Sequence, residues 1–183
     1  VEERRKLLKT AAAELAANRG ELIAAMIMDG GKSIPEGDGE VSEAIDFANY
    51  YADSLSWDGL FDGTDFKPLG TILVAPPWNF PTAIPCGSAL SALMAGNTVI
   101  FKPAPETVYV SWVMINCLWR AGIPKEALQF VSVPDNEIGQ ELVTDERING
   151  VILTGAWETG RMFQSWKPEI RLFAETSGKN SLI

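Results

Sequence analysis

Residues 71–103 have the sequence TILVAPPWNFPTAIPCGSALSALMAGNTVIFKP. Two short apolar runs, residues 71–75 and 98–101, are rich in β-formers and lack an alternation of polar and apolar positions. Such runs are typical of strands that are buried on both faces of a parallel sheet. The segment between them, residues 82–95, carries small residues that would let a helix lie close to that sheet. The stretch therefore predicts a β-α-β unit.

The same rhythm continues toward the C-terminus. Further strands are predicted at residues 128–133, 150–153 and 171–174, and helices at residues 107–121, 137–143 and 158–165. Alternation of this kind predicts the α/β class, with a Rossmann-like parallel sheet and helices on both faces.

The N-terminal part is expected to be helical. Residues 3–28 carry apolar side chains at helical spacing and end in a Gly30-Gly31 pair, so we predict one helix there. A polar loop over residues 33–39, a second helix over residues 40–55 and a turn-rich connection over residues 56–69 follow. We assign residues 1–57 to an N-terminal helical region and residues 58–183 to the α/β part of the same domain.

Composition excludes several functions. The net charge of −9 comes without any basic run, so nucleic acid is not an expected partner. No apolar run reaches the roughly 18 residues that would span a membrane. The chain has no histidine, which excludes Ser-His and Cys-His nucleophile pairs and histidine-bound metals, and we expect no metal site. Cys86 and Cys117 lie in apolar helical stretches, which favours free thiols and a cytoplasmic protein.

Ligands of parallel α/β sheets bind outside the carboxyl ends of the strands, so residues there are the candidate site. Asn79 follows the first strand and is either a turn or helix-cap residue or an amide donor to a developing oxyanion. Lys102 follows the second strand and is either solvated or a donor to a ribose hydroxyl or phosphate. Two prolines, Pro103 and Pro105, stiffen its loop and favour a positioned lysine.

Two further strand ends carry polar or flexible residues. The turn at Gly155 feeds a helix N-terminus, which suits either a phosphate site or a tight turn. It is neither a GxGxxG fingerprint nor a Walker loop, since Gly160 precedes Arg161. Glu175 follows the last predicted strand and is either a turn former or a general base. The residues alone predict a parallel α/β domain with a nucleotide-type ligand.

In this order the segments resemble the aldehyde dehydrogenase superfamily, over essentially the whole chain. Residues 77–81 match its PWNFP, and residues 96–99 followed by 102–103 match its GNTV and KP. Thr154-Gly155 with Glu158 and Gly160 match TGS-x-E-x-G, and Glu175 with residues 178–180 matches E-x-GGKN. The resemblance implies the NAD-binding half of an enzyme that oxidises an aldehyde to an acid.

The resemblance also implies roles for individual residues. Asn79 would help to form the oxyanion hole, and Glu175 would be the general base that activates the deacylating water. The implied cofactor-binding residues are Pro77, Trp78, Lys102, Ala104, Gly155, Ala156 and Glu158. The nucleophilic cysteine would lie in a catalytic domain beyond Ile183, because Cys86 and Cys117 match no nucleophile position.

Three residues differ from the family pattern at positions that bear on cofactor binding. Ala156 stands where serine is common, which removes a hydroxyl contact to phosphate, and Ser177 replaces a glycine. Pro105 stands where many members carry the acid that binds the ribose 2′-hydroxyl, and Glu106 is one step later. We therefore expect NAD, with NADP as the alternative.

Residues 102–107 and 172–178 resemble the Δ1-pyrroline-5-carboxylate dehydrogenases, in particular the bacterial kind fused behind a proline dehydrogenase. This implies L-glutamate γ-semialdehyde as the substrate in proline catabolism, and FAD only in a separate proline dehydrogenase domain outside this chain. The expected partners are the aldehyde, the remaining domains of the parent polypeptide and further copies in a homo-oligomer. The alternatives are another aldehyde dehydrogenase subfamily, an acyl-CoA-forming or reductive relative, and a non-catalytic α/β binding module.

Overall fold

The computed structural model describes residues 1–55, 63–134 and 136–178, and its centre is a five-stranded sheet. The strands are β1 (Thr71–Ala75), β2 (Thr98–Phe101), β3 (Leu128–Phe130), β4 (Ile148–Gly155) and β5 (Leu172–Thr176). They pair in the order β3-β2-β1-β4-β5, and every pair is parallel. The predicted parallel α/β fold is confirmed. The strand order reverses between β1 and β4, which is where such sheets bind ligands.

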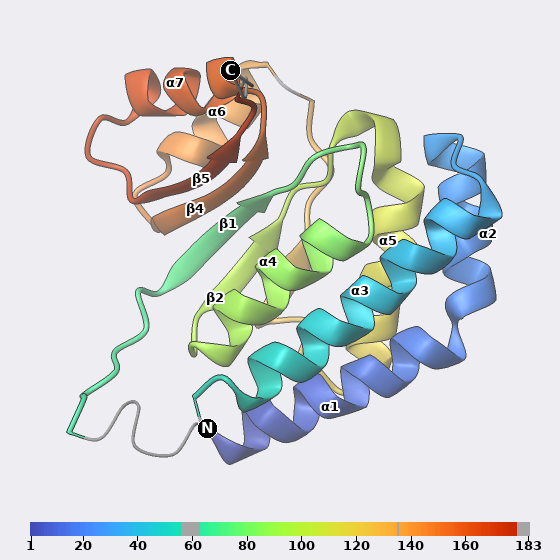
Figure 1. Ribbon diagram of the computed structural model, residues 1–183. Helices are drawn as coiled ribbons and strands as arrows, with labels where there is room; N and C mark the ends of the chain where they lie inside the picture. Colours follow the sequence, from blue (N-terminus) through green and yellow to red (C-terminus); the bar gives the residue numbers. More distant parts are fainter. Residues whose placement is uncertain (56–62, 135, 179–183) are drawn as a thin grey trace, which may run out of the picture.

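Four helices cover the two faces of the sheet (Figure 1). They are α4 (Ala83–Met94) and α5 (Val108–Arg120) on one face, and α6 (Glu137–Thr144) and α7 (Trp157–Trp166) on the other. Strand β1 contributes to both cores, since Ile72 and Val74 pack toward α4 and α5 while Leu73 packs with Phe163 of α7. Because both of its faces are buried, β1 has no polar alternation.

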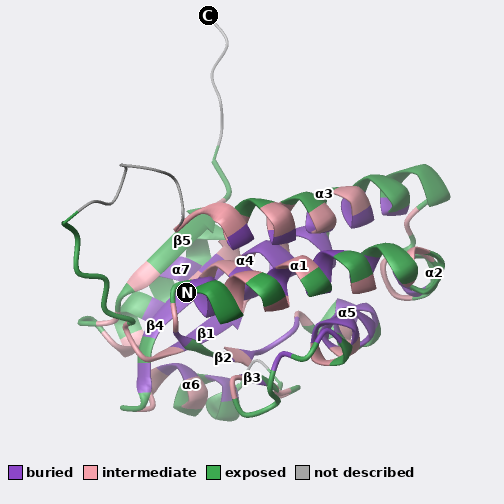
Figure 2. Ribbon diagram, turned by 90° about the horizontal axis from the view of Figure 1, so that it is seen from below, coloured by how far each residue is buried: buried purple, intermediate pink, exposed green. Residues whose placement is uncertain are grey.

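Three N-terminal helices form a further layer outside α4 and α5: α1 (Glu2–Ala17), α2 (Arg19–Gly30) and α3 (Ile34–Asp53). Figure 2 shows that α1 and α3 bury their inner sides and expose their outer sides. Leu8 and Leu15 of α1 and Ala44 and Ala48 of α3 belong to the same core as Val74 of the sheet. The helical layer and the sheet therefore share one apolar interior.

The prediction of a single helix over residues 3–28 is wrong, because the chain breaks at Asn18. The Asn18 side chain donates a hydrogen bond of 2.7 Å to the carbonyl of Glu14, which also accepts from Asn18 N at 3.0 Å, so the two groups share this acceptor at the end of α1. The Asn18 backbone (φ −104°, ψ 18°) leaves the helical region, and α2 starts at the next residue.

The predicted polar loop over residues 33–39 is also wrong, since α3 already begins at Ile34. Ser33 and Glu36 form a capping box in which the Glu36 carboxylate accepts a 2.8 Å hydrogen bond from Ser33 N. Pro35 in the first turn adds a preset φ angle. The predicted connection over residues 56–69 lies partly outside the described residues, as does the boundary at residue 58.

Strands β3 and β5 end at other residues than predicted, because pairing with the neighbouring strand determines where each one ends. β3 ends at Phe130, short of residue 133, because its neighbour β2 ends at Phe101. β5 continues past residue 174, since Glu175 pairs with Thr154 and Thr176 pairs with Gly155. Glu175 therefore lies within the last strand and not in the loop after it. A short 3-10 helix, η1 (Pro105–Thr107), precedes α5 and was not predicted.

Among the described residues, no helix is long and apolar enough to cross a membrane.

Candidate active site

A cavity of about 680 Å³ opens at the carboxyl ends of β1, β2, β4 and β5. Its size is in the range of small-molecule and cofactor sites, about 300–1,000 Å³. The loop after β1, the loop after β2 and the ends of β4 and β5 contribute the polar lining residues Asn79, Lys102, Thr154 and Glu175, and helices α6 and α7 contribute a further part of the lining. The cavity thus lies at the edge of the sheet that the sequence singled out.

Eight of the nine predicted site residues line this single cavity. They are Pro77, Trp78, Asn79, Lys102, Ala104, Gly155, Ala156 and Glu175. The ninth, Glu158, lies exposed in the first turn of α7 and is not among the lining residues. The fold therefore gathers segments that are almost 100 residues apart in the chain.

Lys102 is almost buried, with 8% of its surface exposed. The solvated alternative considered for this lysine is therefore wrong. Its backbone N–H donates to the carbonyl of Val74, and its ammonium group lies 3.4 Å from the carbonyl of Pro103. An ammonium held in a cavity wall suits an electron-rich ligand group, because burial away from water strengthens its hydrogen bonds.

Gly155 was predicted to lie in a turn but is the last residue of β4, paired with Thr176, and it leads directly to the start of α7. A Cβ atom at Gly155 would meet no atom of the described residues within 4 Å. Ala156, the N-cap residue of α7, offers no side chain to cap the helix, and Trp157 N makes only a long contact of 3.4 Å to Ser177 Oγ. The positive end of the helix dipole, with N–H groups that make only long or local contacts, suits a phosphate here.

Asn79 is exposed in the loop between β1 and α4. It does not cap α4, because the N-cap residue of that helix is Thr82. The Asn79 side chain makes no hydrogen bond to another described residue, so its amide is available to a ligand in the cavity. The cap alternative for Asn79 is therefore wrong.

Glu175 is exposed on β5, beside Thr154 in the register of the sheet. Its carboxylate lines the same cavity as Asn79. A donor amide and a potential proton acceptor thus share one hollow, each on a different strand end.

Sequence reasoning missed the apolar wall that α6 and α7 provide. It is made of Gly139, Val143, Met162, Phe163 and Trp166. Phe163 and Trp166 stack with ring centroids 5.6 Å apart. In the sequence these residues have the spacing of an ordinary core-facing helix stripe. Only the folded structure shows that they line the cavity. Glu106 of η1 also lines the cavity.

Neither cysteine belongs to this site. Cys86 in α4 and Cys117 in α5 are free and buried, as predicted. Burial raises the pKa of the Cys86 thiol strongly, and it raises the pKa of the Cys117 thiol to about 11. Thiols of this kind are protonated at neutral pH and are poor nucleophiles.

A parallel sheet in this order, with helices on both faces and a cavity at its carboxyl edge, belongs to the doubly wound, Rossmann-like class of α/β folds. The chain belongs to the aldehyde dehydrogenase family, whose sequence profile matches residues 1–183. The resemblance drawn from the four motifs is thereby confirmed.

The chain is similar to PutA proteins and to 1-pyrroline-5-carboxylate dehydrogenases. The chain is 35% identical over 190 residues to the bifunctional protein PutA of Klebsiella aerogenes, covering 100% of this chain and 14% of that protein. It is 34% identical over 199 residues to the 1-pyrroline-5-carboxylate dehydrogenase of Staphylococcus haemolyticus, covering 99% and 39%. The structure of Proline Utilization A from Corynebacterium freiburgense superposes with a TM-score of 0.90 at 42% identity, covering 97% of this chain and 18% of that one. The chain thus spans well under half of these relatives.

Proposed function

We propose that this chain is the dinucleotide-binding part of an NAD-dependent aldehyde dehydrogenase. The observation that carries the proposal is the single cavity that joins Lys102, Gly155, Asn79 and Glu175. Membership of the aldehyde dehydrogenase family supports it.

The cavity fits a dinucleotide in size and in chemistry. Lys102 would donate to a ribose hydroxyl, and the N–H groups at the start of α7 would bind the pyrophosphate beside Gly155. The apolar side chains of α6 and α7 would cover the adenine. NAD, when bound, accepts a hydride from the substrate. Glu106 supports NAD over NADP, because a carboxylate binds a ribose 2′-hydroxyl and repels a 2′-phosphate.

Asn79 and Glu175 would serve the substrate. The Asn79 amide can donate to the oxygen that becomes negatively charged when a nucleophile attacks the aldehyde. The Glu175 carboxylate can accept a proton from the water that releases the acid. The attacking thiolate would come from another part of the parent polypeptide, since Cys86 and Cys117 are buried and protonated.

We further propose L-glutamate γ-semialdehyde as the substrate, because the similar proteins carry 1-pyrroline-5-carboxylate dehydrogenase and PutA names. The remaining domains of the parent polypeptide are the proposed partners of β5. Phe173 on that edge strand is 54% exposed, and a large apolar side chain there suits a covering surface. The free thiols fit a cytoplasmic enzyme. We also propose that the whole enzyme is a homo-oligomer. FAD would bind only in a separate proline dehydrogenase domain outside this chain.

The test is an assay of the full-length parent protein with glutamate semialdehyde and either NAD or NADP. We expect NADH formation that depends on the aldehyde and is faster than NADPH formation. A parent protein that binds NAD but forms no NADH with any aldehyde would instead be a non-catalytic binding module.

A further inference from the structure

The loop that carries Asn79 has little support from its own backbone. In the described part of the chain, no backbone hydrogen bond joins residues 76–81 to any other segment. Trp78 and Phe80 on either side of Asn79 are exposed. Whatever positions the amide must therefore act through side chains or through the start of α4.

The start of α4 is capped by a residue from another helix. Oε2 of Glu40, on α3, accepts hydrogen bonds from Thr82 N at 3.0 Å and from Ala83 N at 3.3 Å. Glu40 is 3% exposed, and its negative charge lies at the positive end of the α4 dipole. The hydroxyl of Thr82, the natural local cap, is buried and has no hydrogen-bond partner among the residues that the structure describes. The remote carboxylate has replaced a local cap.

Lys32 connects this cap to the loop. Its ammonium group forms an ion pair with Oε1 of Glu40, in the short segment between α2 and α3. The same ammonium lies 4.5 Å from the centroid of the Phe80 ring, which is a cation–π distance. Phe80 adjoins Asn79 in the chain. One cation thus contacts both the cap of α4 and the loop that precedes it.

A buried ion pair of this kind gives little net stability, because desolvation offsets much of its attraction. It does impose geometry, since the carboxylate must face two N–H groups and the ammonium must face both the carboxylate and a ring. A Cβ atom at Gly30 would lie 4.0 Å from Pro81, so the end of α2 also approaches this loop. The arrangement is better suited to locating the loop than to strengthening the core.

We propose that Lys32 and Glu40 are positioning residues that hold the Asn79 amide where the oxyanion develops. The inference rests on the proposed function, in which Asn79 is the oxyanion donor. Neither residue lines the cavity, so both act through residues 80–83. A donor displaced by about 1 Å costs about 10²-fold in rate.

The test uses the full-length enzyme with glutamate semialdehyde, with enzyme in excess so that one turnover is followed. The single-turnover rate constant of NADH formation reports the steps up to hydride transfer. We expect K32M and E40Q to lower this rate constant about 10- to 100-fold and to leave the KM for NAD unchanged. K32R should keep a rate constant close to that of the wild type, because arginine keeps both the charge and the ring contact. In the double variant K32M/N79A the rate should equal that of N79A, since residues that act as one unit are not additive.

A matched control separates positioning from stability. Asp29 Oδ2 likewise accepts from two N–H groups at a helix start, those of Tyr109 at 2.7 Å and Val110 at 3.2 Å in α5. D29N should lower the melting temperature yet leave the single-turnover rate unchanged at saturating NAD. Wild-type rate constants in K32M and E40Q would overturn the positioning role alone. The same conclusion would follow if the fold-loss in K32M/N79A equalled the product of the two single fold-losses. Absence of NADH formation by the unmodified enzyme would overturn the proposed function and this role together.

Discussion

Glu175 on β5 is paired in register with Thr154 on β4, one residue before Gly155, where β4 ends. The pairing holds the backbone of Glu175 inside the sheet while its carboxylate remains exposed in the cavity. A proton acceptor on a strand is held more firmly than one in a loop, which suits a base that must meet a water molecule in one place.

The first prediction concerns Glu175 in the full-length enzyme. Glu175→Gln keeps the shape but cannot accept a proton, so the step that releases the acid should slow while aldehyde attack and hydride transfer proceed. Stopped-flow traces should show a burst of NADH followed by slow turnover. Asn79→Ala is the contrast, because loss of one oxyanion donor typically slows the burst itself by about 10²–10³-fold. Parallel loss of burst, turnover and melting temperature in both variants would make them structural residues only.

The second prediction concerns cofactor affinity. Lys102→Ala should weaken NAD binding to the intact enzyme by about 10- to 100-fold, since a hydrogen bond from a charged group contributes about 1.5–3 kcal/mol. Calorimetric titration with NAD measures it. Lys67→Ala is the matched control, because that lysine is 83% exposed and does not line the cavity. If the Lys102→Ala and wild-type enzymes bound NAD with equal affinity, Lys102 would not contribute to cofactor binding.

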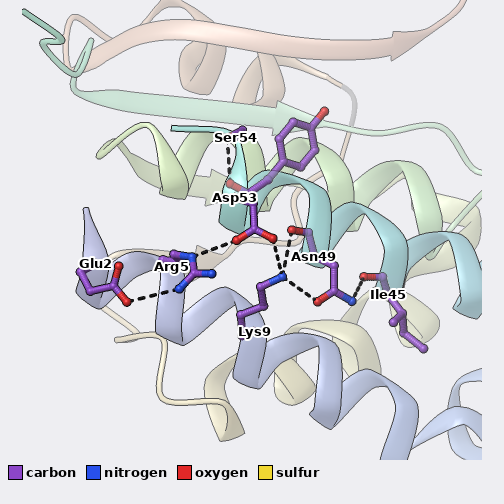
Figure 3. A network of polar contacts seen from close by, with 8 residues as sticks. Glu2, Arg5, Lys9, Ile45, Asn49, Asp53 and Ser54 are labelled. Carbon is purple, nitrogen blue, oxygen red and sulfur yellow. Dashed lines mark hydrogen bonds and ion pairs between the residues drawn. The ribbon is translucent and has the colours of Figure 1, made fainter. Parts of the chain in front are cut away.

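The third prediction concerns acid stability at the contact between α1 and α3, drawn in Figure 3. Asp53 lies 2.7 Å from Lys9 Nζ and 2.9 Å from Arg5 Nε, and these hydrogen bonds lower its pKa below the ordinary value of 3.8. A carboxyl whose pKa is lowered by folding stabilises the protein above its unfolded pKa, and this contribution disappears as the pH falls below about 3.8.

Melting curves as a function of pH should therefore show Asp53→Asn less stable than wild type at pH 7, with the difference shrinking in acid. Asp65→Asn is the control, because its contact to Lys67 is 3.7 Å long and both side chains are 83% exposed. A constant difference between Asp53→Asn and wild type from neutral to acid pH would contradict the assigned cause.

The fourth prediction concerns Asn97 in the motif Gly96-Asn97-Thr98-Val99. Asn97 Oδ1 accepts hydrogen bonds from Leu69 N at 2.7 Å and Gly70 N at 3.0 Å, which fixes the entry into β1. Asn97→Ala should destabilise the protein by about 1–3 kcal/mol in chemical denaturation, because it orphans these donors. Thr98→Ala, which loses only an exposed 3.2 Å contact to Thr71, should change stability by less than about 0.5 kcal/mol. Similar losses in the two variants would argue against this role.

The sequence alone determined the sheet. The apolar runs at 71–75 and 98–101 coincide with β1 and β2, because strands buried on both faces leave a signal that is local and unbroken. It also identified the strand ends, and eight of its nine site residues line one cavity. Local capping chemistry is equally readable in principle: Ser33 and Glu36 mark the true start of α3, although the loop prediction overlooked them.

Tertiary structure decided the rest, because it depends on partners that are distant in the chain. The end of β5 is set by pairing with β4, so no property of residues 171–176 alone could place Glu175 inside the strand. The cavity wall on α6 and α7 consists of ordinary core-type residues, and only the folded structure places them beside the cavity. Lys32 and Glu40 lie about 40 to 50 residues before the helix start and loop that they contact, and only folding brings α3 against α4 and makes them neighbours of Asn79's loop.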